Sequence, residues 1–288
     1  MNTLPPDFIH NLVRTALAED IGAGDITTEA AIPADQRAEA TIVAKEPCVV
    51  AGLPLVEAVF TQIDRTIAIT LLANDGDMVK DGTGVCLIKG PACGILTGER
   101  TALNFLQRLS GIATLTHQFV AKVALASVRV KPKILDTRKT TPTLRILEKY
   151  AVAIGGGTNH RMGLFDAMMI KDNHRVVLAR LGSKALGDAV VSARKKHPNA
   201  PIIIEADNLE QVEEALAAGG DHILLDNMTP DELCKAVTFV GGRAKTEASG
   251  GVRLDTITAI ASTGVDYISV GALTHSARAV DFSLELLD

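Results

Sequence analysis

The feature that most constrains the fold is an alternation of short apolar runs with helical patterns in the second half of the chain. Helical patterns occupy Leu209–Ala218 and Asp231–Val240. Seven apolar runs follow residue 130, each ending in polar or glycine residues: KILDTRK, AVAIGGGTNH, AMMIKDNH, IIIEAD, HILLDN, AKTEASGG and YISVGA. Strands that alternate with helices indicate βαβ units and a parallel sheet. An eight-unit barrel usually needs about 250 residues, so this segment predicts a compact, incomplete barrel of about seven strands.

The first 110 or so residues have a different pattern, which predicts a helix-and-sheet α+β unit. Isoleucine, valine and threonine are frequent in three segments there, and turn residues separate them. The expected elements are a helix at 7–19, strands at 38–46, 66–73 and 83–89, and a long helix at 94–126 with a possible break at Gly111.

Composition excludes several classes of function. A net charge of −5, 3% aromatic residues and no tryptophan argue against a nucleic-acid-binding protein. Apolar stretches are too short for a transmembrane helix, which needs roughly 18 residues or more, and the N-terminus does not resemble a signal peptide. The four cysteines form no CxxC pair, which predicts reduced thiols, a cytoplasmic location and no structural zinc.

The net charge hides an asymmetry. Residues 131–175 contain nine Lys or Arg against four Asp or Glu, so this segment carries +5 and the rest of the chain −10. A basic segment inside an acidic protein suggests a small polyanionic ligand. A solvated helix face would explain the same charges equally well.

Function in parallel barrels is found at the carboxyl ends of the strands. Three of these ends are cationic, two are acidic and two are rich in glycine. They supply, in chain order, Asp136, Arg138 and Lys139; Gly155–Gly157, His160 and Arg161; Lys171–His174; Glu205 and Asp207; Asp226 and Asn227; Ser249–Gly251; and Gly271.

This distribution has a chemical meaning. Cations hold a ligand with several carboxylates, exposed glycine N–H groups hold a phosphate, and acids suit Mg²⁺ or sugar hydroxyls. Each feature also has a structural explanation. Gly155–Gly157 could form a tight turn, His160 could be hydrogen-bonded in the core, Asp226 could cap a helix, and Lys171 could pair with a carboxylate. The combination at one face favours a site.

Several long segments resemble the quinolinate phosphoribosyltransferases. They are GERTALNFLQRLSGIAT, DTRKTTPTLRILEKYAVAIGGGTNHRMGLFDAMMIKDNH, LLDNM, EASGGV and GVDYISVGALTHS. The resemblance runs from about Asp20 to Asp281 and finds no match at 175–200. It implies an N-terminal α/β sandwich at 1–112 packed on a C-terminal barrel at 113–273, with residues 274–288 returning to the sandwich.

The resemblance also implies site residues. Arg138, Arg161 and Lys171 would hold the pyridine dicarboxylate, with Lys139 and His160 beside them. Glu205 and Asp226 would face the ribose and Mg²⁺. Ser249, Gly250 and Gly271 would hold the 5′-phosphate. Arg100 would be donated by the partner subunit of a homodimer or larger assembly. From sequence alone, Arg100 could equally form a surface ion pair. Lys139, Lys171, Glu205 and Asp226 are the candidate catalytic residues.

The resemblance implies transfer of phosphoribose from 5-phosphoribosyl 1-diphosphate to quinolinate, giving nicotinate mononucleotide, diphosphate and CO₂, a step of NAD biosynthesis. The reaction would use Mg²⁺ and no organic cofactor, and neither nucleic acid nor a membrane is an expected partner. Three alternatives remain open. They are a related transferase for another ring acid, a Schiff-base aldolase that uses Lys171, and a non-catalytic anion-binding protein.

Overall fold

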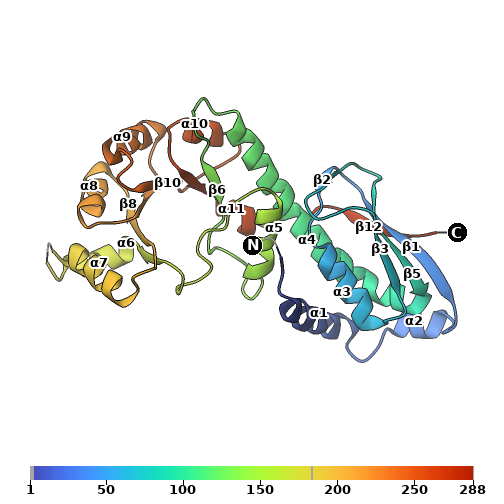
Figure 1. Ribbon diagram of the computed structural model, residues 1–288. Coiled ribbons are helices and arrows are strands. Elements are labelled where there is room, and N and C mark those ends of the chain that lie inside the picture. The colour runs from blue at the N-terminus through green and yellow to red at the C-terminus, as the bar shows by residue number, and fades with distance from the viewer. Residues whose placement is uncertain (1–2, 183, 288) are drawn as a thin grey trace. The chain divides into compact units, whose positions relative to one another are not determined.

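The computed structural model describes residues 3–182 and 184–287, which form two compact units (Figure 1). One contains the chain up to His117 together with 141–156 and 276–288, and the other contains 118–140 and 157–275. No helix among the described residues combines the length and the hydropathy that a membrane span requires.

The first unit is built on a four-stranded antiparallel sheet. Its helices are α1 (Pro6–Ile21), α2 (Ile26–Ala31), α3 (Leu53–Ile63), α4 (Ala92–Ala124, as far as His117) and α5 (Arg145–Ile154). Its strands are β1 (Arg37–Ala44), β2 (Cys48–Val49), β3 (Ala68–Leu71), β4 (Met78–Val79), β5 (Gly84–Pro91) and β12 (Phe282–Leu286). The sheet order is β12-β1-β5-β3, and β2 pairs separately with β4. The helix and three strands predicted for the first 90 residues are therefore confirmed.

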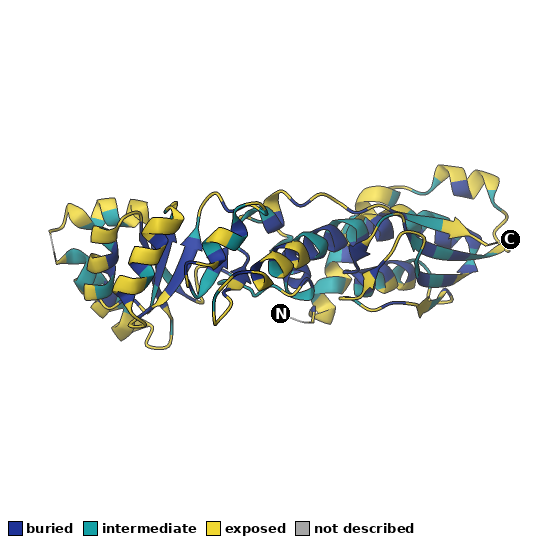
Figure 2. Cartoon of the chain, turned by 90° about the horizontal axis from the view of Figure 1, so that it is seen from above, coloured by how far each residue is buried: buried dark blue, intermediate teal, exposed yellow. Residues whose placement is uncertain are grey.

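The second unit is a parallel α/β sheet. Its strands are β6 (Lys133–Leu135), β7 (Met168–Ile170), β8 (Ile202–Ala206), β9 (His222–Asp226), β10 (Lys245–Ser249) and β11 (Tyr267–Ser269). Its helices are α6 (Asp172–Ala179), α7 (Ala185–Lys196), α8 (Leu209–Ala217), α9 (Pro230–Val240), α10 (Ile257–Ala261) and α11 (Ala272–His275). The sheet order is β6-β11-β10-β9-β8-β7. Buried strands lie inside this unit, and its helices expose their outer faces (Figure 2). The mixed fold class predicted from the sequence is confirmed.

One of the seven predicted strands is wrong. Residues 151–154, the apolar part of AVAIGGGTNH, form the last turn of α5. Leu147, Tyr150 and Ala151 are buried and lie at helical spacing, so the apolar run continues a helical period that began earlier in the chain. At the expected strand position, only an isolated bridge joins Thr158 to Leu135.

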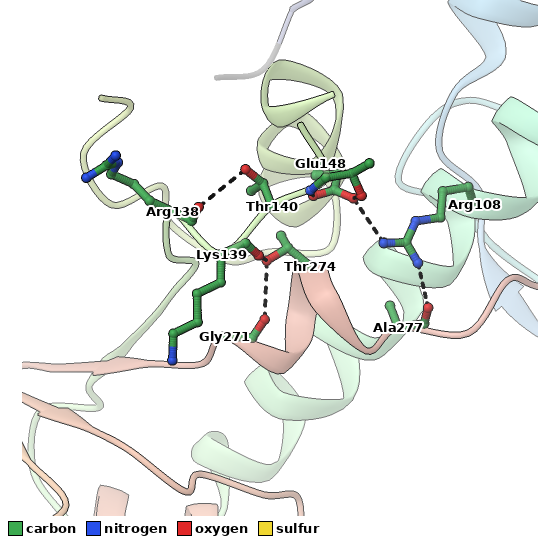
Figure 3. Close-up of polar contacts among 9 residues, drawn as sticks. Arg108, Arg138, Lys139, Thr140, Glu148, Gly271, Thr274 and Ala277 are labelled. Carbon is green, nitrogen blue, oxygen red and sulfur yellow. Dashed lines mark hydrogen bonds and ion pairs between the residues drawn. The ribbon is translucent and has the colours of Figure 1, made fainter. Parts of the chain in front are cut away.

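An ion pair between the half-buried Arg108 and the buried Glu148 connects segments of the first unit that are distant in sequence. Arg108 on α4 donates through Nη2 to Oε1 of Glu148 at 2.9 Å and through Nη1 to the carbonyl of Ala277 at 2.6 Å (Figure 3). β12 then pairs antiparallel with β1, with Ala40 opposite Leu286. The same side chain therefore ties both α5 and the C-terminal segment to α4.

The break predicted at Gly111 does not occur, because α4 continues through this residue. A Cβ atom at Gly111 would lie 2.0 Å from the carbonyl oxygen of Arg278. The glycine therefore permits close approach of the C-terminal segment rather than a bend in the helix. The predicted domain limit at 112–113 falls within this continuous helix and stays a prediction.

The alternation of side chains along the strands places polar groups above an apolar layer. In the second unit Ala167, Ile203 and Leu224 form a buried cluster with Met169 packed against it. Two residues further along each strand, on the same face, come Lys171 after Met169, Glu205 after Ile203 and Asp226 after Leu224. The charged residues at the strand ends therefore lie directly above the apolar core of this unit.

Candidate active site

A cavity of about 760 Å³ lies at the carboxyl ends of the strands of the second unit. Its volume is in the range of small-molecule sites, roughly 300–1,000 Å³. Ten of the eleven site residues predicted from the sequence line it: Arg138, Lys139, His160, Arg161, Lys171, Glu205, Asp226, Ser249, Gly250 and Gly271. The strand-end reasoning therefore brought together residues separated by more than a hundred positions in the chain.

Arg161 is a half-buried cation of the cavity wall. Its Nη1 donates to the carbonyl of Ala167 at 3.0 Å, and its Nη2 lies 3.4 Å from Sδ of Met169. Burial lowers the pKa of this guanidinium, and the charge of Arg138 lowers it further. The smaller, Coulombic part of this lowering comes from a second cation close by, and two neighbouring cations favour an anionic ligand.

Lys171 links the cationic and acidic parts of the cavity. Its Nζ lies 3.3 Å from Oε2 of Glu205, and the main-chain N–H of Asp172 donates to Oε1 of the same carboxylate at 3.3 Å. Glu205 is buried, whereas almost half of the Lys171 side chain is exposed. Lys171 thus presents its ammonium group to the cavity while it stabilises the buried acid.

Lys139 and Gly271 lie side by side on the cavity wall (Figure 3). The hydroxyl of Thr274 donates to the carbonyl of Lys139 at 2.7 Å and lies 3.2 Å from the carbonyl of Gly271. A Cβ atom at Gly271 would lie 3.1 Å from Nε2 of His275 and 3.3 Å from Cδ of Lys139. The absence of a side chain at residue 271 therefore lets two basic side chains converge.

Three carboxylates lie close together at the strand ends, and two of them, Glu205 and Asp226, line the cavity. Oxygen atoms of Glu205, Asp207 and Asp226 all lie within 4.8 Å of one another. Carboxylate oxygens are the ligands that Mg²⁺ prefers, and it usually takes one or two of them together with substrate phosphates. The donor set therefore fits Mg²⁺. Asp207 is a residue that the sequence placed at a strand end without a metal role.

The Ser249–Gly251 turn requires glycine at its centre. Gly250 has a φ of +89°, and a Cβ atom there would lie 2.1 Å from Oδ1 of Asn227. Gly251 has a φ of +60° and no atom within 4 Å of a Cβ position. Glycine tolerates these positive φ values, and turns of this kind can offer successive main-chain N–H groups to an anion.

The other glycine run does not line the cavity. Gly155 follows α5, and a Cβ atom there would lie 2.3 Å from the carbonyl oxygen of Ala113 on α4. Of the two explanations left open for Gly155–Gly157, an anion site or a tight turn, the structure supports the second. His160 and Arg161, which follow, do reach the cavity.

Arg100 is the predicted residue that does not line this cavity. It lies on α4 in the first unit, where its side chain is exposed.

Sequence reasoning also missed some cavity residues. They are Thr137, Met169, Glu247, Val252, Arg253 and His275. Glu247 could have been found, because it precedes Ser249 by two residues and so shares its face of the strand.

Two family models match the chain. The quinolinate phosphoribosyl transferase N-terminal domain matches residues 25–110, and the C-terminal domain of the same family matches residues 112–285. The two matches together cover both units and all eleven predicted site residues.

Individual proteins are similar over almost the whole chain. A probable nicotinate-nucleotide pyrophosphorylase [carboxylating] of Bacillus subtilis is 43% identical over 283 residues, 96% of this chain and 93% of that protein. A quinolinate phosphoribosyltransferase [decarboxylating] of Nicotiana tabacum is 42% identical, covering 98% of this chain and 83% of that protein.

Solved structures agree with these sequences. The nicotinate-nucleotide pyrophosphorylase of Francisella tularensis superposes with a TM-score of 0.91 at 40% identity, covering 99% of this chain and 98% of that one. The enzyme of the same name from Ehrlichia chaffeensis gives a TM-score of 0.89 at 40% identity over 99% and 100% of the two chains. The two family models, the relatives that match almost the whole chain and the solved structures all agree. This chain belongs to the quinolinate phosphoribosyltransferase family.

Proposed function

We propose that this protein transfers phosphoribose from 5-phosphoribosyl 1-diphosphate to quinolinate and releases diphosphate and CO₂, giving nicotinate mononucleotide for NAD biosynthesis. The observation that carries the proposal is the division of one cavity between cationic and acidic side chains. A pyridine dicarboxylate suits the first group, and a phosphorylated sugar with a diphosphate suits the second together with the glycine turn.

The cationic residues bind and orient quinolinate. Arg138, Arg161 and Lys171 hold its two carboxylates, with Lys139 and His160 beside them. The arginines act as bidentate partners and the lysines as point charges. Orientation of the ring nitrogen towards the anomeric carbon of the sugar lowers the barrier, because a positioned reactant has lost its translational freedom beforehand.

The acidic residues and the glycine turn position the sugar diphosphate. Glu205 and Asp226, with Asp207 beside them, would hold Mg²⁺. The ion would supply positive charge to stabilise the diphosphate leaving group. Ser249, Gly250 and Gly271 offer main-chain and hydroxyl donors to the 5′-phosphate.

The chemical steps need no organic cofactor. The bond from the anomeric carbon to the diphosphate oxygen breaks, and a bond from that carbon to the pyridine nitrogen forms. The resulting positively charged ring accepts the electron pair left behind when the adjacent carboxylate leaves as CO₂, and a solvent proton then bonds to that ring carbon.

The assembly is a second part of the proposal. Arg100, exposed on α4, would complete the site of a partner subunit in a homodimer or larger assembly. Mixing two inactive variants, Arg100→Ala and Lys171→Ala, tests this proposal. Recovery of activity after subunit exchange supports donation between subunits, and its absence despite demonstrated exchange contradicts it.

The experiment that tests the activity follows CO₂ and nicotinate mononucleotide from quinolinate, 5-phosphoribosyl 1-diphosphate and Mg²⁺. Equal amounts of both products support the proposal. Turnover of nicotinate but not of quinolinate would identify a transferase for another ring acid instead. Borohydride trapping of Lys171 with a carbonyl substrate would identify the aldolase, which the ion pair of Lys171 with Glu205 disfavours. The cytoplasmic location expected from the cysteines stays a prediction, which cell fractionation tests.

A further inference from the structure

A carboxylate with no exposed surface lies at the base of the cavity. Glu247 is in the middle of β10, on the same face as Ser249, and its side chain is 0% exposed. Oε2 lies 3.3 Å from Nε2 of His160 and 2.9 Å from Nε2 of His222. These are ion-pair distances, although the N–H directions of the two rings are not aligned with the oxygen. One acid therefore lies between two largely buried imidazoles.

The other nitrogen of His160 faces the main chain. The N–H of Arg161 donates to Nδ1 of His160 at 2.6 Å. A main-chain N–H can only donate, so Nδ1 must be the unprotonated nitrogen of this ring. The ring proton of His160 is consequently on Nε2, the nitrogen that faces Glu247.

Glu247 suits the role of a permanent negative charge beside the two imidazoles. Burial alone would raise the pKa of its carboxyl group, but the contacts with His160 and His222 outweigh burial and hold the pKa below its usual value. The ring of His222 also packs against Tyr267, with 5.2 Å between the ring centroids. The carboxylate therefore stays ionised, and the Tyr267 ring restricts the movement of its second partner, His222.

The main chain around His160 is held as well. Its N–H donates to Oδ1 of the fully buried Asp136 at 2.8 Å, and Nδ2 of Asn159 donates to Oδ2 of the same acid at 2.7 Å. These bonds fix where the main chain of the residue lies, but they do not act on the imidazole itself. Contact with Glu247 selects one orientation, the one in which Nδ1 faces the N–H of Arg161.

We propose that Glu247, supported by His222, is a positioning residue that fixes Arg161 through the imidazole of His160. Although Glu247 lies at the base of the cavity, its side chain is 0% exposed and faces His160, so it acts through His160. Arg161 is then held at its main chain by His160 and at its guanidinium by Ala167. That the ligand of Arg161 is a carboxylate of quinolinate rests on the proposed function.

The first test is the isosteric variant Glu247→Gln, which removes the charge and one acceptor. The KM for quinolinate should rise about 10- to 100-fold, because a displacement of about 1 Å has effects of that size. The KM for 5-phosphoribosyl 1-diphosphate should change less than about threefold. The matched control is Asp266→Asn, since Asp266 contacts Lys245 and Thr246 at the opposite end of the same strand, and it should change neither KM. Equal increases in both KM values for Glu247→Gln would contradict a positioning role.

A double-mutant cycle separates positioning from a general effect on the fold. In an Arg161→Lys background, Glu247→Gln should cause less than about half of its effect on quinolinate affinity, measured as a change in free energy, because both changes act on one contact. Full additivity would overturn the proposal.

Histidine nitrogen NMR of the ligand-free enzyme gives a readout that does not depend on activity. The signals of His160, assigned with His160→Asn, should show protonation at Nε2 only, and Glu247→Gln should introduce the Nδ1-protonated form. An Nδ1-protonated wild type, or an unchanged spectrum in a folded Glu247→Gln variant, would contradict the proposal. If quinolinate is not a substrate, the proposed function fails while this NMR result still decides the role of Glu247.

Discussion

The two sides of the cavity differ in how their charges are compensated. On the cationic side, burial and the nearby charge of Arg138 lower the pKa of the Arg161 guanidinium. On the acidic side Glu205 is already paired with Lys171, and Asp207 and Asp226 lie beside it. Because Lys171 and Glu205 form an ion pair, a substitution at either residue disturbs the cationic and the acidic side together. Substitutions that test one side alone must therefore be made at residues outside this pair.

The largest expected effect follows Arg161→Ala, a change confined to the cationic side. Loss of a half-buried guanidinium that pairs with a carboxylate typically costs 2–5 kcal/mol, roughly 30- to several thousand-fold in affinity. Calorimetry should show that quinolinate affinity falls by about this factor while affinity for 5-phosphoribosyl 1-diphosphate with Mg²⁺ is retained. Arg243→Ala, which changes an arginine outside the cavity, is the control, and loss of both affinities in Arg161→Ala would break the comparison.

The acidic side is best tested with Asp226→Asn, because Asp226 does not pair with Lys171. The KM for 5-phosphoribosyl 1-diphosphate should rise about 10- to 100-fold, and the Mg²⁺ concentration for half-maximal rate should rise with it, since an amide is a weaker ligand for a hard cation. Quinolinate affinity should be unchanged. A Mg²⁺ dependence identical to that of the wild type would remove Asp226 from the acidic side.

Gly250→Ala tests the turn that adjoins the acidic side. The new Cβ atom would lie 2.1 Å from Oδ1 of Asn227, and the φ of +89° adds backbone strain of about 1–3 kcal/mol. The melting temperature should fall and the KM for the sugar diphosphate should rise several-fold. Gly242→Ala, with a φ of +78° and no atom near its Cβ position, should lower stability alone, so a rise in KM for both variants would contradict a role of the turn in binding.

The smallest effect concerns Asp266, at the end of β10 away from the cavity. Burial alone would raise the pKa of this carboxyl group, but bonds from Lys245 and Thr246 outweigh it and lower the pKa below the unfolded value of about 3.9. The contribution to stability is therefore present above that pH and is lost as the pH falls through the folded pKa.

Urea unfolding between pH 6 and pH 3 measures this contribution. The wild type should lose slightly more stability than Asp266→Asn over this range, by less than about 1 kcal/mol because the pair is partly exposed. Turnover of the two proteins at neutral pH should agree. A larger loss of stability in Asp266→Asn than in the wild type would contradict a stabilising contribution of the ionised Asp266 carboxylate.

The strand ends could be predicted because parallel strands direct their last residues to one face, so Arg138, Lys171, Glu205 and Asp226 follow from the chain order alone. The run at 151–154 could not be assigned correctly, since four apolar residues fit a strand as well as the last turn of a helix. The close packing at Gly111 could not be predicted either, because the residue that contacts it in space, Arg278, is distant in sequence. Glu247 was overlooked because it lies within a strand rather than at its end.

Chemistry was harder to predict than position. The sequence assigned His160 a place beside the ligand, but the contacts of its ring nitrogens with Arg161 and Glu247 depend on angles that no spacing encodes. Asp207 likewise became a candidate ligand only through its distance from Glu205 and Asp226.

The most direct test of the central claim is a crystal structure of the protein with quinolinate alone. The division of the cavity predicts both carboxylates within hydrogen-bonding distance of Arg138, Arg161 or Lys171, and no contact between quinolinate and the Ser249–Gly251 turn. Quinolinate bound at that turn, or against Asp207 and Asp226, would contradict the account.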